Sequence, residues 1–456
     1  MPYIFNTPDE QREMLEAIGV DSIEQLFDMV PAELQLQRPL DIPPALGEME
    51  MTRLAEQLAA QNLHSGNSSC FLGGGSYDHF IPAVVDAIAN RSEFYTSYTP
   101  YQPEVSQGNL QAMFEYQSLI CQLTGMDVSN ASLYDGGSAT AEAVLMAINA
   151  TRRNGRVIVT STLHPEYRQI LATYLANLDL ELVVIPAVDG RADLAEIEQQ
   201  LDDQVACVVT QSPNFFGCIE DLEAISTLAH DAGALSIAVF DPISLGILKR
   251  PGELGADIAV AEGQSLGVPM LYGGPYLGIM ACRESFVRRL PGRIAGQTVD
   301  RRGTRCWVLT LQTREQHIRR EKATSNICTN QGLLALRASV YLASLGPAGL
   351  AETASLCARK THYLAEKLCQ LDRFERRFDA AVFKEFVIRD RTAQVSELLE
   401  KAASQNILAG IPLARWYPQM EDCFLVAVTE QRTKDEIDTL VECLASADSE
   451  QVSVDA

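Results

Sequence analysis

The 456-residue chain is 47% hydrophobic and 21% charged, which is typical of a folded globular protein and excludes the disordered and fibrous classes. Its formal net charge of −24 repels phosphate backbones and anionic membrane surfaces, so we expect no nucleic-acid partner. At roughly 100–200 residues per domain, the length predicts two or three domains.

The 11 cysteines are spread from Cys70 to Cys443 without a C-x-x-C pair or a zinc-site spacing, so no metal site is expected. An odd, unclustered set of cysteines indicates reduced thiols. The N-terminal stretch carries no basic and then apolar leader, and no run reaches the roughly 18 apolar residues of a membrane span. We therefore expect a cytoplasmic protein with no membrane partner.

The first seventy residues are predicted to form short helices separated by prolines. The patterns place helices at residues 9–18, 22–30 and 48–61, with Pro31 and the Pro43-Pro44 pair between them. Such helices make a poor domain by themselves. They can wrap a neighbouring subunit or pack on a core of their own, and the sequence favours neither alternative. We describe residues 1–70 as an N-terminal helical arm.

From about residue 126, short β-branched or apolar runs alternate with segments of helical length. Strand, helix and strand repeated at this interval predict a mostly parallel sheet with helices on both faces. Residues 71–347 are therefore predicted to form a large α/β domain. The expected strands cover residues 156–160, 181–185, 207–210, 235–240 and 257–261, and the expected helices cover residues 166–177, 194–201 and 222–232.

A second, smaller unit is predicted after Pro347. It begins with a long helix near residues 351–371, continues with strands near 381–388 and 423–428, and ends with a helix at 434–446. Residues 348–446 thus form a small C-terminal domain in this prediction. The polar residues 447–456 are expected to fray.

A glycine turn enters a helix within residues 132–142, with hydroxyl side chains in the first helical turn. Free backbone N–H groups and the positive end of the helix dipole can hold an anion such as phosphate there. Gly136, Gly137 and Ser138 are the candidate anion-binding residues. An ordinary helix cap explains the same pattern equally well.

Polar side chains follow three of the expected strands, at the edge where open α/β sheets bind ligands. His164 comes after the first strand, residues 211–214 follow the third, and Asp241 ends the fourth. Each residue alone is more often a cap or a hydrogen-bonded structural group. Together with the glycine turn, they match a known arrangement.

The arrangement resembles the large domain of the aspartate-aminotransferase-like enzymes, which depend on pyridoxal phosphate (PLP). The resemblance implies PLP-dependent transferase fold type I, with a three-layer α/β/α large domain and a smaller α+β C-terminal domain. In that superfamily a glycine-rich helix start holds the phosphate, a histidine or aromatic residue stacks on the ring, a strand-end aspartate pairs with the pyridine nitrogen, and a lysine forms the Schiff base. By position, the first three roles fall to Gly136, Gly137, Ser138, His164 and Asp241.

The Schiff-base lysine is absent where the superfamily has it. The strand at residues 257–261 is followed by Gln264 and Ser265, which form hydrogen bonds but cannot condense with an aldehyde. Lys249, in an expected solvated loop, and Lys322, far beyond the expected point, are the remaining candidates. We therefore expect a vestigial cofactor site, no covalently bound cofactor and no assigned catalytic residue in this chain.

Five further stretches resemble one family more closely, the glycine decarboxylases or P-proteins of the glycine cleavage system. The resemblance is to the N-terminal half of that enzyme and, in length, to its separate first subunit in bacteria that split it. The long last stretch has little chance of arising by accident. The stretches are residues 71–79, 94–108, 262–267, 291–294 and 309–328.

This resemblance implies a glycine dehydrogenase (aminomethyl-transferring, decarboxylating) that acts in glycine catabolism. Such an enzyme removes CO2 from glycine and passes the aminomethyl group to the lipoyl arm of the H-protein, alongside the T-protein and L-protein. A second, similar subunit supplies PLP and the Schiff-base lysine. The present chain would be the cofactor-free partner, inactive alone.

Superfamily active sites lie at a subunit boundary, so this chain is expected to contribute side chains to a shared site. Tyr95, Tyr98 and Tyr101 offer aromatic surface with hydroxyl groups, although packing on the following helix is an equal alternative. Fixed cationic groups near residue 320 would suit a cofactor phosphate or the glycine carboxylate, although a solvated helix face is the usual meaning of such a run. The candidates in that segment are Arg314, Arg319, Arg320, Lys322 and Asn326.

Two other functions stay open at this point. One is an autonomous PLP-dependent decarboxylase or lyase that uses Lys249 or Lys322. The other is a non-catalytic scaffold that binds the H-protein without lining the site.

Overall fold

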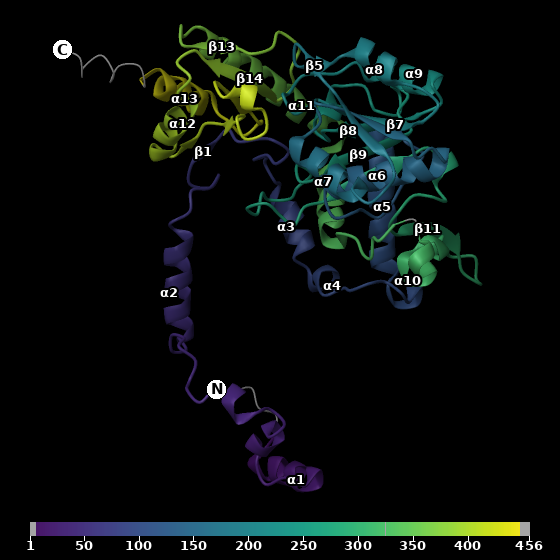
Figure 1. Ribbon diagram of the computed structural model, residues 1–456, viewed down its shortest axis with the longest axis vertical. Helices are drawn as coiled ribbons and strands as arrows, with labels where there is room; N and C mark the ends of the chain where they lie inside the picture. The colour runs from purple at the N-terminus through teal and green to yellow at the C-terminus, as the bar shows by residue number, and fades with distance from the viewer. Residues whose placement is uncertain (1–5, 324, 447–456) are drawn as a thin grey trace, which may run out of the picture. The chain divides into compact units, whose positions relative to one another are not determined.

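The computed structural model describes residues 6–323 and 325–446, and the described chain divides into two units, residues 6–62 and residues 63–446 (Figure 1). The expected tail at 447–456 lies outside the described residues.

The N-terminal unit consists of short helices with no core of their own. Helix α1 (Pro8–Ile18) starts at a capping box in which Thr7 Oγ1 accepts from Glu10 N, and it ends at Gly19, whose φ of 85° favours glycine. Helix α2 spans Glu48–Ala59, and the helix expected over residues 22–30 is only a short 3₁₀ turn at Glu24–Phe27.

No residue between 6 and 62 is buried, and apolar side chains such as Phe27 and Met29 face solvent. Met29 is 86% exposed. The alternative that these helices pack on a core of their own is therefore wrong.

The C-terminal unit is built on a seven-stranded sheet with the strand order β2-β10-β9-β8-β7-β3-β4. Strands β9, β8, β7, β3 and β4 run parallel, and β10 is antiparallel to both of its neighbours. The predicted parallel sheet is confirmed, with three strands at the expected bounds. The strands are β2 (Val128–Ser129), β3 (Arg156–Thr160), β4 (Glu181–Ile185), β7 (Val205–Ser212), β8 (Leu235–Phe240), β9 (Ile258–Glu262) and β10 (Gly278–Cys282).

Helices cover both faces of this sheet, because alternate strand residues point to opposite sides. Val157 and Val159 face α6 (Gly136–Thr151) and α7 (Pro165–Leu175), whereas Ile158 faces α8 (Leu194–Gln200) and α9 (Leu222–Asp231). On the α9 side, α3 (Ala83–Ala89), α5 (Gln107–Thr124) and α11 (Gly332–Cys369) complete the layer (Figure 1). The result is three layers, α/β/α.

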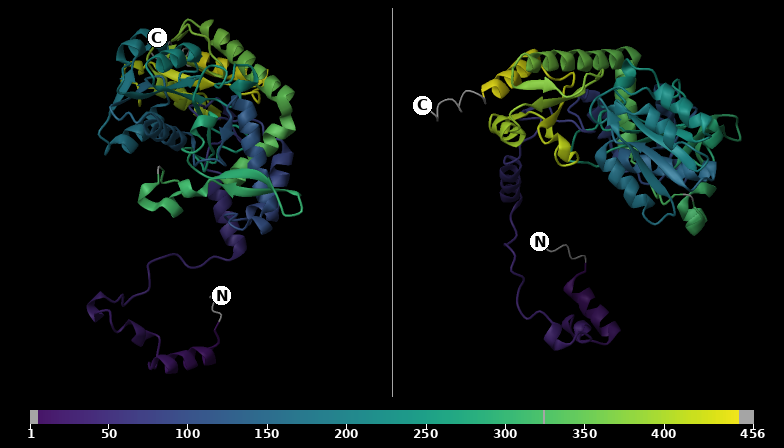
Figure 2. Two further views of the ribbon diagram at one scale, coloured as in Figure 1. Left: turned by 90° about the vertical axis from the view of Figure 1, so that its right-hand side faces the viewer. Right: turned by 45° about the horizontal axis from the view of Figure 1, so that its top comes forward.

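Helix α11 joins this layer to a second sheet. It is kinked at Gly346, where φ is 60°, directly before Pro347. Within the described ranges it is the one helix long and apolar enough by composition to cross a membrane, but Ala338, Tyr341 and Leu350 lie in the protein's own core. Figure 2 shows its second part lying along the C-terminal sheet. The predicted domain boundary at residues 347–348 coincides with the kink and stays a prediction.

The C-terminal sheet is antiparallel, with the order β13-β14-β17-β16, and its core includes Phe374, Phe386 and Phe424. The short strand β1 (Ser69–Cys70) pairs with β15 (Ile407–Leu408) beside it. The helix expected at residues 434–446 is confirmed. The elements are β13 (Phe374–Arg376), β14 (Glu385–Asp390), α12 (Val395–Ser404), β16 (Ile411–Pro412), β17 (Cys423–Ala427) and α13 (Lys434–Ser446).

The segment around residue 320 does not form the helix face that was considered for it. A hairpin of β11 (Ile294–Val299) and β12 (Arg305–Thr310) leads into three short turns. The only α-helical turn among them is α10 (Gln316–Arg319). The basic side chains therefore lie on short turns rather than on one helix face.

Candidate functional site

The carboxyl ends of β7, β8 and β9 surround one small cavity, which we call the strand-end pocket. It is lined by His164, Asp241, Glu262, Ser265 and Lys384, with further residues of the glycine-rich segment at 73–77. The structure thus brings together three of the side chains that the sequence singled out, His164, Asp241 and Ser265. Its free volume is only about 30 Å³.

Asp241 already has a cationic partner from its own chain. Lys384 Nζ lies 2.6 Å from Asp241 Oδ2, and the lysine is 2% exposed. The other carboxylate oxygen accepts from Ile243 N and Ser244 N. Lys384 Nζ also lies 3.4 Å from the centre of the Tyr77 ring. The carboxylate that would face a pyridine nitrogen is therefore neutralised internally.

The start of α6 is also occupied by a group of the same chain. Gly136 N donates to Glu262 Oε2 at 2.9 Å, and Leu277 N and Gln264 N donate to Glu262 Oε1. Asp135 caps the next turn by accepting from Ser138 N. Burial raises the pKa of Glu262 to about 8, although these backbone donors oppose the shift. A carboxyl group thus lies where a phosphate would bind.

His164 is packed into the chain on its ring face. It stacks on Tyr167 with centroids 4.6 Å apart, its Nε2 donates to Gly74 O at 2.7 Å, and its Nδ1 accepts from Glu166 N. Burial lowers its pKa, so the ring is neutral. Both ring nitrogens and one ring face are therefore engaged within the chain.

The two residues at the missing lysine's position do different things. Gln264 holds the backbone of Tyr77 by accepting from Tyr77 N and donating to Tyr77 O. Ser265 lines the strand-end pocket, and its buried hydroxyl has no partner among the described residues. Neither side chain can form a Schiff base.

PLP does not fit this pocket. Ligand pockets have volumes of roughly 300–1,000 Å³, at least about ten times the free space of about 30 Å³ here. Lys384 fills the place beside Asp241, and Glu262 fills the place at the α6 N-terminus. The amine of Lys384 is engaged in an ion pair with Asp241.

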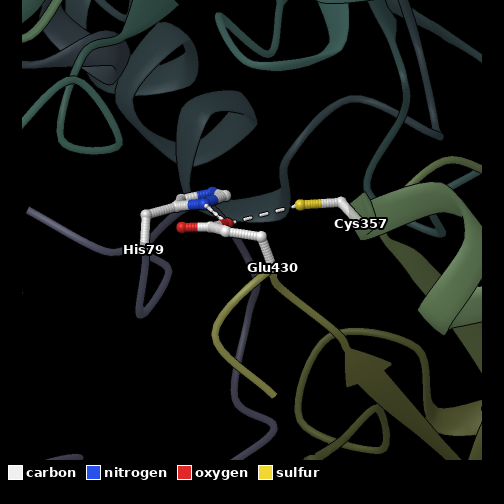
Figure 3. A group of neighbouring side chains, drawn as sticks. All are labelled: His79, Cys357 and Glu430. Atoms are coloured by element: carbon white, nitrogen blue, oxygen red, sulfur yellow. Dashed lines mark hydrogen bonds and ion pairs between the residues drawn. The ribbon is translucent and has the colours of Figure 1, made fainter. Parts of the chain in front are cut away.

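Lys384 also joins a buried chain of polar groups that ends at Cys357. Figure 3 shows its other members, His79, Glu430 and Cys357. His79 Nδ1 donates to Glu430 Oε2 at 2.6 Å, and its Nε2 lies 3.0 Å from Lys384 Nζ. Burial alone would raise the pKa of Glu430, but His79 and Phe80 N lower it to about 2. An ammonium can only donate, so His79 Nε2 accepts from it and Nδ1 carries the proton. A metal on Nδ1 would require the opposite tautomer, which disfavours a metal site there.

A second cavity, of about 250 Å³, opens beside α4 (Ser92–Tyr95) and the start of α11; we call it the Arg293 cavity. It brings Tyr95 and Tyr98 together with Arg293, which was noted only as part of a family motif. Tyr98 is 92% exposed, so aromatic packing within the chain, the alternative weighed for this cluster, does not explain it. Tyr101 lies at the edge, with its ring centroid 5.9 Å from the Arg293 guanidinium carbon.

The remaining predicted cations occupy different positions. Arg314 is partly buried and donates to Leu311 O and Gly292 O, so it supports the turn that carries Arg293. Burial lowers its pKa. The four other candidates of that segment are exposed: Arg319, Arg320, Lys322 and Asn326. Their contribution to a shared site stays a prediction.

Lys249 and Lys322 lie outside the strand-end pocket. The Lys249 side chain is 71% exposed and lies 3.8 Å from Glu223. Neither lysine is positioned to bind a cofactor beside Asp241.

Comparisons with known proteins agree with this geometry. The family described as "Glycine cleavage system P-protein" matches residues 1–444. The chain is 52% identical to a probable glycine dehydrogenase (decarboxylating) subunit 1 from Desulforamulus reducens, over 96% of this chain and 98% of the relative. The identity to a protein of the same description from Carboxydothermus hydrogenoformans is 51%, over 97% and 99%.

Solved structures give the same result. A crystal structure of glycine decarboxylase (P-protein) of the glycine cleavage system, in inhibitor-bound form, matches with a TM-score of 0.89 and 44% identity, covering 98% of this chain and 100% of the other. A sphingosine-1-phosphate lyase from Burkholderia pseudomallei, 14% identical, matches with a TM-score of 0.67 over 92% and 94%. The latter supports only the fold, which is PLP-dependent transferase fold type I. The chain belongs to the glycine cleavage system P-protein family.

Proposed function

We propose that this chain is the cofactor-free subunit 1 of a glycine dehydrogenase (aminomethyl-transferring, decarboxylating). The observation that carries the proposal is the strand-end pocket, where Lys384 and Glu262 occupy the positions a cofactor would need. A chain with the scaffold of a PLP enzyme but no room for PLP acts through another chain. In this proposal a PLP-bearing subunit 2 is that chain.

Two exposed surfaces support a heteromer. The N-terminal unit carries exposed apolar side chains, including Phe27, Met29 and Ile42. In the C-terminal unit, Tyr95, Tyr98 and Tyr101 are exposed together. Exposed apolar groups and clustered tyrosines are typical of protein–protein interfaces.

The reaction proposed for the complex is decarboxylation of glycine, with transfer of the aminomethyl group to the lipoyl arm of the H-protein. PLP on the partner would accept the electrons that loss of CO2 releases. This chain's part is to close the site: tyrosine rings exclude water, and their hydroxyl groups and nearby cations orient the substrate. The T-protein and L-protein would process the products.

All 11 cysteines are unpaired thiols, among them the exposed Cys328 and Cys369. Unpaired thiols are typical of the reducing cytoplasm. We therefore place the complex in the cytoplasm.

The test combines the full chain with subunit 2 and H-protein and measures CO2 release from carboxyl-labelled glycine. We expect turnover only when both subunits are present. We also expect the chain alone to retain no cofactor absorbance after it is mixed with PLP and the unbound PLP is removed. Retention of PLP by this chain alone, with decarboxylation of glycine, would overturn the proposal.

A substitution distinguishes this role from that of a scaffold that only binds H-protein. Tyr95→Phe removes one hydroxyl at the Arg293 cavity and leaves the ring. If the assembled complex keeps normal exchange of bicarbonate into glycine after this change and after Tyr98→Phe, the tyrosine hydroxyls take no part in the site. If bicarbonate exchange into glycine continues at the wild-type rate when Tyr95, Tyr98 and Tyr101 are all truncated, the chain acts as a scaffold that only binds H-protein.

A further inference from the structure

Arg293 is a buried cation without an anionic partner. It is 4% exposed, and no carboxylate of residues 6–323 or 325–446 forms an ion pair with it. A buried charge is normally paired, because removing it from water costs several kcal/mol. The uncompensated guanidinium therefore points to an anion that is not among the described residues.

Neutral groups hold this guanidinium in one orientation. Nη1 donates to Thr329 Oγ1 at 3.1 Å and to Asn330 Oδ1 at 2.9 Å, and Nη2 donates to Cys328 O at 3.2 Å. Holding a side chain from several directions reduces the entropy lost when a ligand binds.

The opposite edge of the guanidinium is less well satisfied. Nη2 reaches Thr99 Oγ1 only at 3.5 Å, and Nε has no partner among the described residues. Two parallel N–H groups on one edge are the geometry that binds a carboxylate through both of its oxygens. The edge formed by Nε and Nη2 is therefore the part of the guanidinium that the described residues satisfy least.

The cavity around Arg293 suits a small ligand. Its volume of about 250 Å³ is below the roughly 300–1,000 Å³ of pockets for drug-sized ligands. Arg293 is the one charged side chain in its lining, and Tyr95, Tyr98 and Met113 contribute aromatic and apolar surface. No carboxylate lines it, so no anionic side chain there would pair with the amine of an amino acid.

We propose that the Arg293 cavity binds the carboxylate of the amino-acid substrate while the substrate amine is held by the partner subunit. The cavity offers a cation for the carboxylate of an amino acid but no anionic side chain for its amine, so it provides half of an amino-acid site. The inference rests on the proposed function, which supplies the partner for the amine. Arg293 is then a specificity-determining residue that separates amino acids from simple amines.

The test uses the assembled complex of full-length subunits, with ligand binding followed through the partner's cofactor absorbance. Glycine is compared with methylamine, which has the amine and lacks the carboxylate. Arg293→Gln is expected to weaken glycine binding roughly 10- to 100-fold, the range for a lost charge-assisted hydrogen bond, and to leave methylamine binding unchanged. Arg301→Gln, in the exposed turn between β11 and β12, is the matched control and should change neither.

A second pair of variants keeps Arg293 and its fold. Thr329 is exposed and accepts from Arg293 Nη1, so Thr329→Asp places an internal carboxylate on the guanidinium, and Thr329→Asn is its neutral counterpart. We expect Thr329→Asp to weaken glycine binding by roughly tenfold or more and Thr329→Asn to have little effect. Methylamine binding should be the same in both.

Three results would overturn the inference. Equal weakening of glycine and methylamine binding, or no effect of Arg293→Gln and Thr329→Asp on either ligand, excludes a carboxylate site. If Arg293→Gln prevents subunit assembly while Thr329→Asp binds glycine normally, Arg293 pairs with an acidic side chain of the partner subunit and not with the substrate. In all three cases wild-type turnover by the mixed subunits would leave the proposed function standing, whereas absent wild-type turnover would reject the proposed function itself.

Discussion

The Lys384 ammonium lies 2.6 Å from the Asp241 carboxylate, so a cation from the start of β14 occupies the position next to the strand-end aspartate of β8. Glu262 likewise occupies the position at the α6 N-terminus where a cofactor phosphate would bind. The fold of a PLP enzyme is thus kept, while its own polar side chains take over the contacts that a cofactor would make. A cofactor site that has lost its ligand would otherwise leave buried polar groups unpaired, which is costly.

Breaking this ion pair should destabilise the chain. Lys384→Met leaves the largely buried Asp241 unpaired, and loss of one partner of a buried pair costs about 3–5 kcal/mol. We expect a drop of that order in the free energy of unfolding, measured by urea denaturation. Lys384→Met combined with Asp241→Asn should recover a large part of it, since both charges are then gone. If the double variant is less stable than the single one, the pair is not the cause.

Glu262 predicts a pH dependence of stability. Its folded pKa of about 8 lies above the unfolded value of about 4.5, so its contribution is fully present below pH 4.5 and is lost as the pH rises through 8. Glu262→Gln cannot titrate. The free energy of unfolding of the wild type should therefore fall relative to that of Glu262→Gln between about pH 5 and pH 8, by at most about 5 kcal/mol. Parallel pH profiles would contradict this. Burial also raises the pKa of Glu385 to about 7, but Glu385 is present in both proteins and cancels from the comparison.

The sheet could be predicted from the sequence because its signals are local. The strands at residues 156–160, 181–185 and 235–240 are short apolar runs bounded by turns, and their bounds are those observed. The strand-end positions of His164 and Asp241 follow from the same pattern. Absence of a lysine after β9 could be seen directly, because it concerns residue type rather than geometry.

What occupies the pocket could not be predicted, because it depends on contacts between distant parts of the chain. Lys384 meets Asp241 only once the C-terminal sheet packs beside β8, and nothing near residue 384 indicates this. The sequence shows that Glu262 follows an expected strand. It does not show that the carboxyl group lies next to the glycine turn, because the two are far apart in the chain and meet only in the folded structure. The burial of Arg293 likewise depends on Thr329 and Asn330, which precede α11.

Gly136 should not tolerate a side chain. A Cβ there would contact Tyr167 Oη and would lie 2.8 Å from Glu262 N, which is closer than real Cβ atoms approach. Gly136→Ala is expected to lower the free energy of unfolding by about 1–3 kcal/mol, as overpacking does. Gly108→Ala is the control: that glycine lies in α5 with nothing within 4 Å, so alanine should stabilise the helix by about 0.5–1 kcal/mol. Equal effects at both positions would show that the close approach at α6 is not needed.

The exposed tyrosines predict a separation between folding and association. Tyr98 is 92% exposed, so Tyr98→Ala should leave the free energy of unfolding of the isolated chain within about 0.5 kcal/mol of the wild type. In the complex, loss of a tyrosine at an interface typically costs more than 1 kcal/mol, so we expect the affinity for subunit 2, or the rate of glycine decarboxylation, to fall at least severalfold. Tyr174→Ala, on the outer side of α7 at 41% exposure, is the matched control for an exposed tyrosine away from the Arg293 cavity. Measuring association and turnover with both variants shows whether Tyr98 lies at the interface with subunit 2 or on ordinary surface. If Tyr98→Ala and Tyr174→Ala behave alike in the complex, the cluster at residues 95–101 is ordinary surface, and the boundary with the partner subunit lies elsewhere.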